Sequence, residues 1–547
     1  MKKTEMLSQR AQKWLVAVFF VILTAIGFLT VPDYGVPTDE EREIITLQYH
    51  AREYARLFTG DRDAAKTYFD ARGVTEPSLQ DYVDHSYGSA LLYPTAPLML
   101  LDSISVYLRM FLWHSYLFLV FMLGCWALYG IVTMLFQSRI LGCAGVLLLY
   151  LSPLFFAEAH YNSKDTPMMA MTLVMLWQGA RLMHKPSLPR ALWFALAGAV
   201  ATNQRVIGLA LFGLIALFVL LSHLLRRKYA RQALLIAAGA TVAGFLGFYY
   251  ILTPNAWGQP WMNFPDAIST FSRFGWDGLV LFRGTVYMLP EDPLPGEYIL
   301  FLIGMTTPVP LLVAMTLGQL GAVKDFFVKG RDPAGNGRML AILLCSLMWI
   351  LPLAYFAIAR PPVYNGWRHY QFVYGLLIIM AVYGLHTVGR LLKPRWLKGA
   401  GLAAVAAYLV ITAAGMAQNH PYQFAYYNEL VNDAAETEEG DYWFMAVHGA
   451  VRALLHDPGV NPDEPLSVSN FGPYHISALM PEELSRVEWL PHSEWRKAKY
   501  VLVGSRKWYV EEDTNYFTYE GLLSEFDEYM VVESYGNPVM YIYERVY

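Results

Sequence analysis

The sequence predicts an α-helical polytopic membrane protein with interface helices in its first outer loop and a small C-terminal α/β domain. Three observations lead to this fold class. Of its 547 residues, 55% are hydrophobic and only 16% are charged, whereas soluble globular chains carry about 25% charged residues. A helix needs about 20 mostly apolar residues to cross a bilayer. Apolar runs close to this length recur between Trp14 and Met416. Beyond Gln418 the chain becomes polar and these runs stop.

The first apolar run, Trp14 to Val31, follows a basic stretch within residues 1–13. It is long enough to span, and no small-residue cleavage site follows it, so we interpret it as a retained signal anchor. Further candidates bring the total to about eleven spans. They are Leu112–Phe136, Ile140–Phe156, Thr166–Met183, Ala191–Thr202, Val206–Leu225, Ala233–Leu252, Tyr298–Leu320, Leu340–Ala359, Phe372–Val388 and Gly399–Met416.

Lysine and arginine in the short loops predict the orientation, because cytoplasmic loops are enriched in these residues. In one membrane topology every strongly basic loop and the N-terminus lie on the cytoplasmic side. The C-terminal end then lies on the opposite side. This topology also supports the short run Ala191–Thr202 as a span, since removing it would invert every later loop. The basic loop residues are Arg139, Arg181, Lys185, Arg190, Arg226, Arg227, Lys228, Arg231, Lys324, Lys329, Arg331, Arg338, Arg390, Lys393, Arg395 and Lys398.

The predicted domains are a transmembrane domain over residues 1–417 and an extracytoplasmic α/β domain over 418–547. The first outer loop covers 32–109. We expect a helix over Glu40–Phe58 in this loop, and an interfacial helix in the apolar stretch Leu91–Leu108, which contains two prolines. In the C-terminal domain a helical pattern covers Tyr442–Leu455, and strand-like runs cover Tyr500–Val503 and Val539–Tyr543.

Two carboxylates, Asp39 and Glu40, follow the first span on the outer side. One interpretation is structural: both are solvated, or Asp39 caps the helix that begins at Glu40. The other is functional, with one carboxylate held at the membrane surface as a general base. Both interpretations stay open at this stage.

Cations gather on the same outer side, where the positive-inside rule depletes them. Lys164 precedes Asp165 at the start of a span, where Asp165 also fits an N-cap-like role. Arg205 lies in a very short connection, where it could extend to headgroups, and Arg368 lies in a later outer loop. Cations near lipid are costly unless paired with an anion. Their shared side therefore indicates a phosphate site, with Asp165, His85, Tyr364 and His369 as further substrate-binding candidates.

Several chemistries are not indicated. The net charge of −4 shows no basic excess for nucleic acid. Nucleotide-binding fingerprints are absent from the sequence, and the histidines lack metal-ligand spacing. We expect no required cofactor, although a divalent cation would become possible if the outer carboxylates converge. Cys125, Cys143 and Cys345 lie in apolar runs and are interpreted as packing residues.

This pattern resembles the GT-C membrane glycosyltransferases, in the bacterial branch related to protein O-mannosyltransferases and lipid A aminoarabinose transferases. The acidic pair after the first span carries the resemblance, together with local stretches between 162 and 443. These stretches are Asn162–Pro167, Tyr364–His369, His420–Glu429 and Asp441–Trp443.

The resemblance implies an enzyme of a bacterial inner membrane that uses a polyprenyl-phosphate sugar as its donor. It implies a base role for Asp39, with Glu40 beside it, and phosphate binding by Lys164. We interpret the chain as an inverting glycosyltransferase acting on a lipid, glycan or protein hydroxyl at the outer face. A lipid or sugar transporter is the alternative, although its charges would be expected at mid-depth. A non-catalytic assembly protein or sensor is the third possibility.

Overall fold

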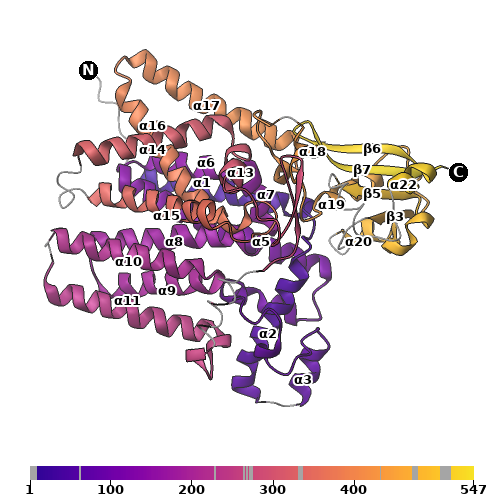
Figure 1. Ribbon diagram of the computed structural model, residues 1–547, viewed down its shortest axis with the longest axis horizontal. Helices are drawn as coiled ribbons and strands as arrows, with labels where there is room; N and C mark the ends of the chain where they lie inside the picture. The colour runs from indigo at the N-terminus through magenta and orange to yellow at the C-terminus, as the bar shows by residue number, and fades with distance from the viewer. Residues whose placement is uncertain are drawn as a thin grey trace.

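A computed structural model describes residues 9–60, 63–226, 229–262, 265, 269, 275–329, 337–431, 433–470, 479–504 and 519–546. The helices lie side by side along the long axis of the molecule (Figure 1). At one end of this bundle lie α2 and α3 together with the C-terminal sheet domain. The region of α2 and α3, near the start of the chain, and the C-terminal domain therefore lie at the same end of the bundle.

The predicted polytopic helical fold is confirmed. Eight of the helical segments in the described residues are long and apolar enough to cross a membrane, or nine if a bent pair is one span. The eight contain α1 (Gln9–Thr30), α5 (Val106–Phe136), α10 (Ile207–Arg226), α11 (Arg231–Leu252), α14 (Val309–Lys329), α15 (Gly337–Ala359), α16 (Tyr374–Leu391) and α17 (Arg395–Gln418).

Each of the eleven predicted spans contains a helix, but three of them differ from a simple full-length span. The third is a pair, α6 (Arg139–Tyr150) and α7 (Pro153–Tyr161), bent by 75° at a break that contains the Ser152–Pro153 step. The fifth is α9 (Leu188–Gln204), whose 17 residues fall short of a full crossing. The eighth is divided into α13 (Tyr298–Met305) and α14 by a break before Val309. The fourth, α8 (Asp165–His184), is a continuous 20-residue helix outside the eight.

The first outer loop contains the expected long helix and a shorter interfacial segment than expected. Helix α2 runs from Glu40 to Thr59, followed by α3 (Asp63–Asp70). The predicted helix over Leu91–Leu108 is instead a 3-10 helix, η3 (Ala90–Thr95), and a five-residue helix, α4 (Ala96–Leu100). Pro94 and Pro97 explain the interruption, because proline donates no backbone hydrogen bond and restricts the residue before it. Short 3-10 helices η1 (Val31–Asp33) and η2 (Leu79–Asp81) complete this region.

A hairpin that sequence analysis missed lies in the outer loop before α13. Strands β1 (Leu279–Phe282) and β2 (Thr285–Met288) pair antiparallel around the two-residue turn Arg283-Gly284. Both turn residues have positive φ, 52° and 74°, as the primed turns that match strand twist require. The hairpin also touches the C-terminal region through a bridge between Phe282 and Glu438.

The C-terminal region forms a five-stranded mixed sheet in the order β4-β3-β5-β7-β6. Both predicted strands are present, as β5 and β7, and β3 pairs parallel with β4 and β5. The helix predicted over Tyr442–Leu455 begins later than expected, at Ala446. The Asp441 carboxylate accepts hydrogen bonds from the backbone N–H groups of Met445 and Ala446, and thereby sets this start. The elements are β3 (Leu466–Asn470), β4 (Val487–Trp489), β5 (Tyr500–Gly504), β6 (Phe526–Ser534), β7 (Asn537–Arg545), α18 (Ala434–Thr437), α19 (Ala446–Leu455), α20 (Pro481–Leu484) and α22 (Tyr519–Glu525).

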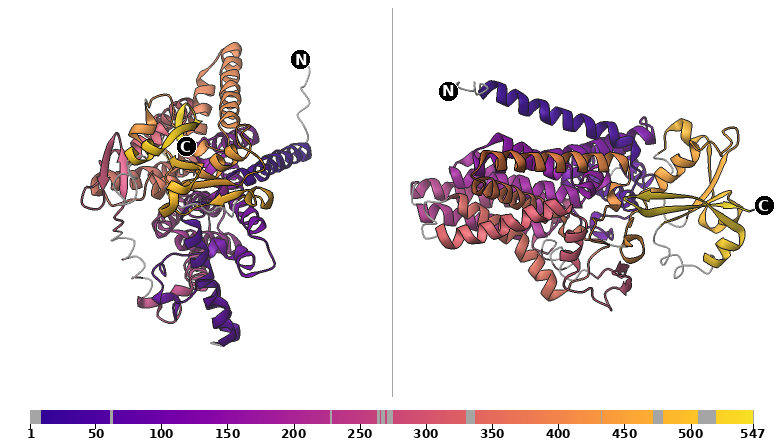
Figure 2. Two further views of the ribbon diagram at one scale, coloured as in Figure 1. Left: turned by 90° about the vertical axis from the view of Figure 1, so that its right-hand side faces the viewer. Right: turned by 90° about the horizontal axis from the view of Figure 1, so that it is seen from above.

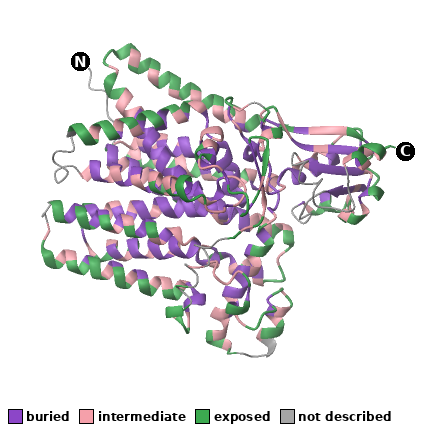
Figure 3. Cartoon of the chain, viewed as in Figure 1, coloured by how far each residue is buried: buried purple, intermediate pink, exposed green. Residues whose placement is uncertain are grey.

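Burial divides the bundle into a core and a lipid-facing shell. More than half of the residues in each of α5, α8 and α16 are buried, whereas α11 and α17 are largely exposed (Figure 3). Seen from above, α1 runs along one edge of the bundle, and the sheet domain lies beyond the far end (Figure 2). Because lipid is the solvent of the exposed helices, their apolar surface needs no protein cover.

Of the basic loop residues used for the orientation, Arg227, Lys228 and Arg331 lie outside the described residues, as does the basic N-terminal stretch over residues 1–8. The free cysteines Cys125 and Cys345 are buried in the bundle, in keeping with a packing role.

Two glycines let α14 and α16 approach closely. A Cβ placed on Gly318 of α14 would overlap the carbonyl oxygen of Met380, and one on Gly384 of α16 would overlap the carbonyl oxygen of Ala314. Small residues at such contacts allow the close backbone packing that holds helices together in lipid. This helix pair therefore depends on the absence of side chains at both positions.

We expect Gly384→Ala to lower the thermal unfolding temperature of the purified protein and its yield of monodisperse material. Overpacking of a tight contact costs about 1–3 kcal/mol. Gly389→Ala on the same helix is the matched control, because a Cβ there meets open space. An equal effect of the two substitutions would refute the close-packing account.

Candidate active site

Asp39 is the N-cap residue of α2, but within the described residues its carboxylate makes no capping bond to the helix. Instead its Oδ2 accepts a hydrogen bond of 2.8 Å from Nη2 of Arg368. The side chain is 50% exposed. Of the two interpretations drawn from the sequence, the structure does not support a capping role and leaves this carboxylate facing an open side.

Glu40 is turned the other way and does not join Asp39. It is 1% exposed, and its Oε2 lies 2.8 Å from Nε2 of His114 on α5. Its other oxygen is buried with no hydrogen-bond partner among the described residues. The two neighbouring acids therefore have different surroundings, and only Asp39 faces the cluster of cations described below.

Arg368 lies at the centre of this cluster. Its Nη2 bonds Asp39 and its Nε donates to Oδ2 of Asp165 at 3.1 Å. Its guanidinium lies 4.3 Å from the ring centroid of Trp443, which belongs to the polar C-terminal region. The side chain is only 8% exposed. One buried cation thus joins α2, α8, the 3-10 helix η5 (Arg368–Val373) and the C-terminal region.

Asp165 is the first residue of α8, and a neighbour fulfils the capping role that sequence analysis considered for it. The side-chain oxygen of Asn162 accepts the backbone N–H groups of Lys164 and Asp165 at 3.0 and 2.7 Å. The Asp165 carboxylate, fully buried, is then left to pair with both Arg205 and Arg368. Arg205 is therefore an ion-pair partner here, and its Nε is buried with no hydrogen-bond partner among the described residues.

Lys164 completes the set of three cations. Its ammonium lies 2.6 Å from Oε1 of Glu43 and 3.8 Å from the ring centroid of Tyr87. Glu43 is one turn beyond Asp39 on α2, so both carboxylates reach the same side of the helix. The three cations Lys164, Arg205 and Arg368 are balanced by three carboxylates, Asp39, Glu43 and Asp165. We call these six residues the charged cluster.

The first outer loop is held against the cluster through Tyr87 and Gly88. The Tyr87 hydroxyl lies 3.2 Å from that of Tyr364. A Cβ on Gly88 would overlap the backbone carbonyl of Asn203 at the end of α9, and the Asn203 side chain accepts the backbone N–H of Ala90 at 2.8 Å. This contact fixes the loop close to Lys164 and Arg205.

The other substrate-binding candidates lie at different distances from the cluster. Tyr364 and His369 pack together, with ring centroids 4.8 Å apart, and Arg368 lies 5.1 Å from the Tyr364 ring. His85 bonds its own loop, with Nδ1 2.8 Å from the Tyr82 carbonyl oxygen. It is not among the described residues that line the cavity beside the cluster. The structure thus brings Tyr364 and His369 to the site and leaves His85 outside it.

Four further residues belong to this site by contact, and sequence reasoning did not assign them. Glu43 and Tyr87 contact Lys164, Trp443 stacks on Arg368, and the Tyr442 hydroxyl donates to Glu158 at 2.8 Å. Only Glu43 had a local signal, its spacing of four from Asp39 on a predicted helix. The others come from distant parts of the chain, which sequence spacing cannot connect.

The surroundings of the two carboxylates on α2 shift their pKa values in opposite directions. Burial disfavours the charged form of Asp39, but the charge and hydrogen bond of Arg368 outweigh it, and the pKa lies below its usual value. Burial raises the pKa of Glu43, and Lys164 only partly offsets this effect. Asp39 is therefore the more readily ionised of the two.

The outer carboxylates do not form a metal centre. Glu158 accepts hydrogen bonds from Asn162, Gln371 and Tyr442, while Asp39 and Asp165 face cations. Within the described residues no group of three or more acidic, histidine or cysteine side chains is arranged to hold a metal ion. The expectation that no cofactor is required stays a prediction.

A cavity of about 590 Å³ opens beside the charged cluster and has two kinds of wall. Its polar end is formed by Tyr87, Lys164, Gln204, Arg205 and His369. The rest is apolar, formed by residues Val206–Leu214 at the start of α10, Leu347–Tyr355 of α15, and the outer loop at 361–363. The cavity can therefore receive an anionic group at one end and a hydrocarbon chain along the other.

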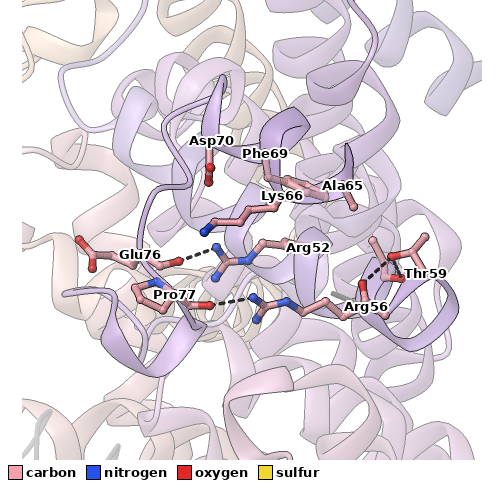
Figure 4. A pocket seen from close by; sticks show the side chains of 11 residues that line it. Arg52, Arg56, Thr59, Ala65, Lys66, Phe69, Asp70, Glu76 and Pro77 are labelled. Atoms are coloured by element: carbon pink, nitrogen blue, oxygen red, sulfur yellow. Dashed lines mark hydrogen bonds between the residues drawn. The ribbon is translucent and has the colours of Figure 1, made fainter. Parts of the chain in front are cut away.

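A second hollow on the outer side, between α2 and α3, has a different character (Figure 4). Arg52 and Arg56 point to its floor, where they donate to the backbone carbonyls of Glu76 and Pro77 at 2.6 and 2.7 Å. These bonds fasten the loop after α3 to α2. We therefore assign these arginines a structural role.

Comparisons with known proteins return solved structures only. No family model matches the chain, and no curated protein matches it. ArnT from Cupriavidus metallidurans bound to undecaprenyl phosphate aligns over 97% of this chain and 98% of its own, with 15% identity and a TM-score of 0.42. The Archaeoglobus fulgidus oligosaccharyltransferase in its apo form aligns over 90% of this chain and 70% of its own, with 12% identity and a TM-score of 0.42.

Both alignments extend over most of this chain. The features that bear on function are the charged cluster and its cavity.

The charge balance of the cluster leads to a test with Glu43→Gln. The substitution keeps the shape of the side chain and leaves one positive charge uncompensated, so polyprenyl phosphate should bind more tightly. We expect a decrease in Kd of roughly three- to tenfold, equivalent to about 1 kcal/mol. The measurement is equilibrium binding of a labelled polyprenyl phosphate to purified protein. Glu41→Gln, at an exposed position of the same helix, is the control, and weaker binding by Glu43→Gln would contradict this account.

Proposed function

We propose that this protein is a membrane glycosyltransferase that moves a sugar from a polyprenyl-phosphate sugar to an acceptor hydroxyl. The reaction takes place at the outer face of a bacterial inner membrane, with the N-terminus in the cytoplasm. The acceptor is a hydroxyl of a lipid, a glycan or a protein. The observation that carries this proposal is the cavity, which joins a cationic end to long apolar walls. The charged cluster that supplies its cations also contains a half-exposed carboxylate, Asp39.

The cavity matches the two halves of such a donor. A polyprenyl phosphate has an anionic head and a long hydrocarbon tail, one for each kind of wall in the cavity. Lys164 and Arg205 offer charge-assisted hydrogen bonds to the phosphate. The apolar side chains of α10 and α15 offer hydrophobic contact to the first isoprene units.

Asp39 is suited to act as the base. Burial acts to raise its pKa, but Arg368 outweighs this effect and favours the ionised form that a base requires. Its half-exposed side chain is open to an arriving hydroxyl. In the proposed step the acceptor oxygen attacks the anomeric carbon while Asp39 takes the hydroxyl proton. The bond from that carbon to the phosphate oxygen breaks on the opposite face, and the configuration inverts.

The departing polyprenyl phosphate gains negative charge as the bond breaks. Lys164, Arg205 and Arg368 are positioned to stabilise that charge, in the manner of a preorganised oxyanion site. Within the cluster each of these cations is paired with a carboxylate. When the donor binds, the three cations therefore exchange contacts with carboxylates for contacts with the phosphate. Because one set of ionic contacts replaces another, the affinity for the phosphate stays moderate enough for product release.

A transporter would share the cavity but would not break a glycosidic bond. Purified protein supplied with a panel of labelled polyprenyl-phosphate sugars and with acceptor-rich membrane extract distinguishes the two. Release of free polyprenyl phosphate together with labelled acceptor would support the transferase and identify the sugar. Binding of the lipid with no release, by well-folded protein, would favour the transporter.

Asp39→Asn should lower kcat by about 10²–10⁴, the usual contribution of general-base assistance, and leave donor binding within a few-fold. Glu40→Gln should leave kcat within a few-fold and lower thermal stability, because it disturbs a buried pair with His114. The measurements are steady-state turnover, donor binding and a thermal melt for each variant. Near-normal turnover in Asp39→Asn would remove Asp39 from the mechanism.

As the pH falls, kcat/KM should reach half of its maximum only below pH 3.8, the ordinary pKa of an aspartate. The reason is that the pKa of Asp39 is lowered, so the base stays ionised down to a lower pH. Arg368→Gln removes the main cause of the lowering, so this midpoint should move to higher pH while burial still favours the protonated form. The measurement is the pH profile of kcat/KM for both proteins. An unchanged midpoint in the variant would show that Asp39 does not control it.

A further inference from the structure

A second cavity in the membrane region, of about 200 Å³, lies at the other end of the bundle from the charged cluster. It is formed by the last turns of α5 and α8 and the first turns of α15. Helix α8 connects the two sites: Asp165 at its start belongs to the cluster, and His184 at its end lines this cavity. Twenty helical residues rise about 30 Å, so the cavity opens near the opposite membrane face.

The walls of this cavity are mainly apolar, with polar groups near the helix ends. They are formed by Ile131, Met134, Leu135, Leu176, Ala180, Met183, Ala341 and Cys345, with Gly337, Arg338 and His184 near the helix ends. Methionine and leucine side chains make an adaptable surface for hydrocarbon. The lining is therefore suited to one segment of an acyl chain.

Arg338 gives the cavity a charged group at the end of α15. Its guanidinium lies 4.6 Å from the ring centroid of Phe136 and 5.9 Å from that of Tyr383. The nearby carboxylate of Asp325 accepts a hydrogen bond of 2.6 Å from the Tyr383 hydroxyl. Within the part of the chain that the structure describes, no hydrogen bond or ion pair occupies the Arg338 guanidinium. Its donors are thus not taken up by any of the described residues.

Other features at this membrane face also favour an anion. Helix α15 begins at Gly337, so the positive end of its dipole lies at the same place as Arg338. The exposed ends of α8 and the loop after it add His184 and Lys185. A cation near lipid is costly unless an anion accompanies it, and basic pockets between membrane helices bind acidic lipid headgroups.

We propose that this cavity is a binding site for an anionic phospholipid of the membrane face opposite the charged cluster. A segment of one acyl chain fills the apolar part of the cavity, and the lipid phosphate accepts hydrogen bonds from Arg338. The bound lipid joins the ends of α5, α8 and α15 and stabilises their junction. This site is independent of the proposed glycosyl transfer, which belongs to the other face.

The test uses full-length protein stripped of lipid in a neutral detergent and titrated with phosphatidylglycerol. Native mass spectrometry counts bound lipids, and a thermal melt follows stability, because a ligand that binds only the folded state raises the unfolding temperature. We expect one retained phosphatidylglycerol and a rise in Tm. Phosphatidylcholine with the same acyl chains should bind roughly tenfold more weakly, and glycerol phosphate without chains should give no shift.

Two variants and one control assign the binding to this cavity. Arg338→Gln should weaken phosphatidylglycerol binding roughly tenfold by removing the charge, and Ala341→Leu should abolish it by filling the cavity. Arg395→Gln, at an exposed basic position at the start of α17, should bind like the unaltered protein. If either site variant fails to fold, the competition among the three ligands on unaltered protein still decides the question.

Three outcomes would overturn the proposal. These are equal affinity for phosphatidylglycerol and phosphatidylcholine, a comparable shift with glycerol phosphate alone, or unchanged lipid binding in well-folded Arg338→Gln and Ala341→Leu. The first would indicate a non-specific acyl groove, and the second a site for small phosphate esters. None of them bears on transferase activity, which is measured separately.

Discussion

The pairing of Arg368 with Asp39 and Asp165 is the interaction on which the outer end of this protein depends. A buried guanidinium is costly without counter-charges, and removing one partner of such a group is strongly destabilising. Arg368 satisfies this requirement with a carboxylate from the start of α2 and another from the start of α8, and it packs against Trp443. Segments more than 300 residues apart are thereby fixed at one point. The same arrangement favours the ionised form of Asp39 and holds it within the charged cluster.

Much of the membrane fold follows from the sequence, because bilayer thickness and loop charge restrict what a long apolar run can do. A helix occurs in each predicted span. The bend between α6 and α7, the short α9 and the break before α14 were not predicted as such. They lie where helices are supported by neighbouring protein, and tertiary packing there permits shapes that a lipid-exposed helix avoids.

The sequence predicted on which side of the membrane the candidate site lies and which charged residues it contains. It did not predict which of these residues pair with one another. The predicted membrane topology assigned Asp39, Lys164, Arg205 and Arg368 to one side of the membrane. The structure places all four in one cluster. The sequence could not tell Asp39 from Glu40, because that choice depends on His114 of α5, which gives Glu40 a buried partner. Nor could it foresee Tyr442 or Trp443, whose positions are set by the Asp441 cap and by packing against the bundle.

The contribution of residues 439–443 has a consequence for the order in which the protein matures. Glu439 accepts hydrogen bonds from Asn365 and Gly366, and Tyr442 and Trp443 contact Glu158 and Arg368. Ribosomes make the chain from the N-terminus, so these groups emerge only after every membrane helix has been synthesised. The cover over the charged cluster is therefore completed late, once residues 439–443 have docked on the helical bundle. In a partly synthesised chain the cations and carboxylates would lie together without this cover. The site would then become complete only at the end of synthesis and folding.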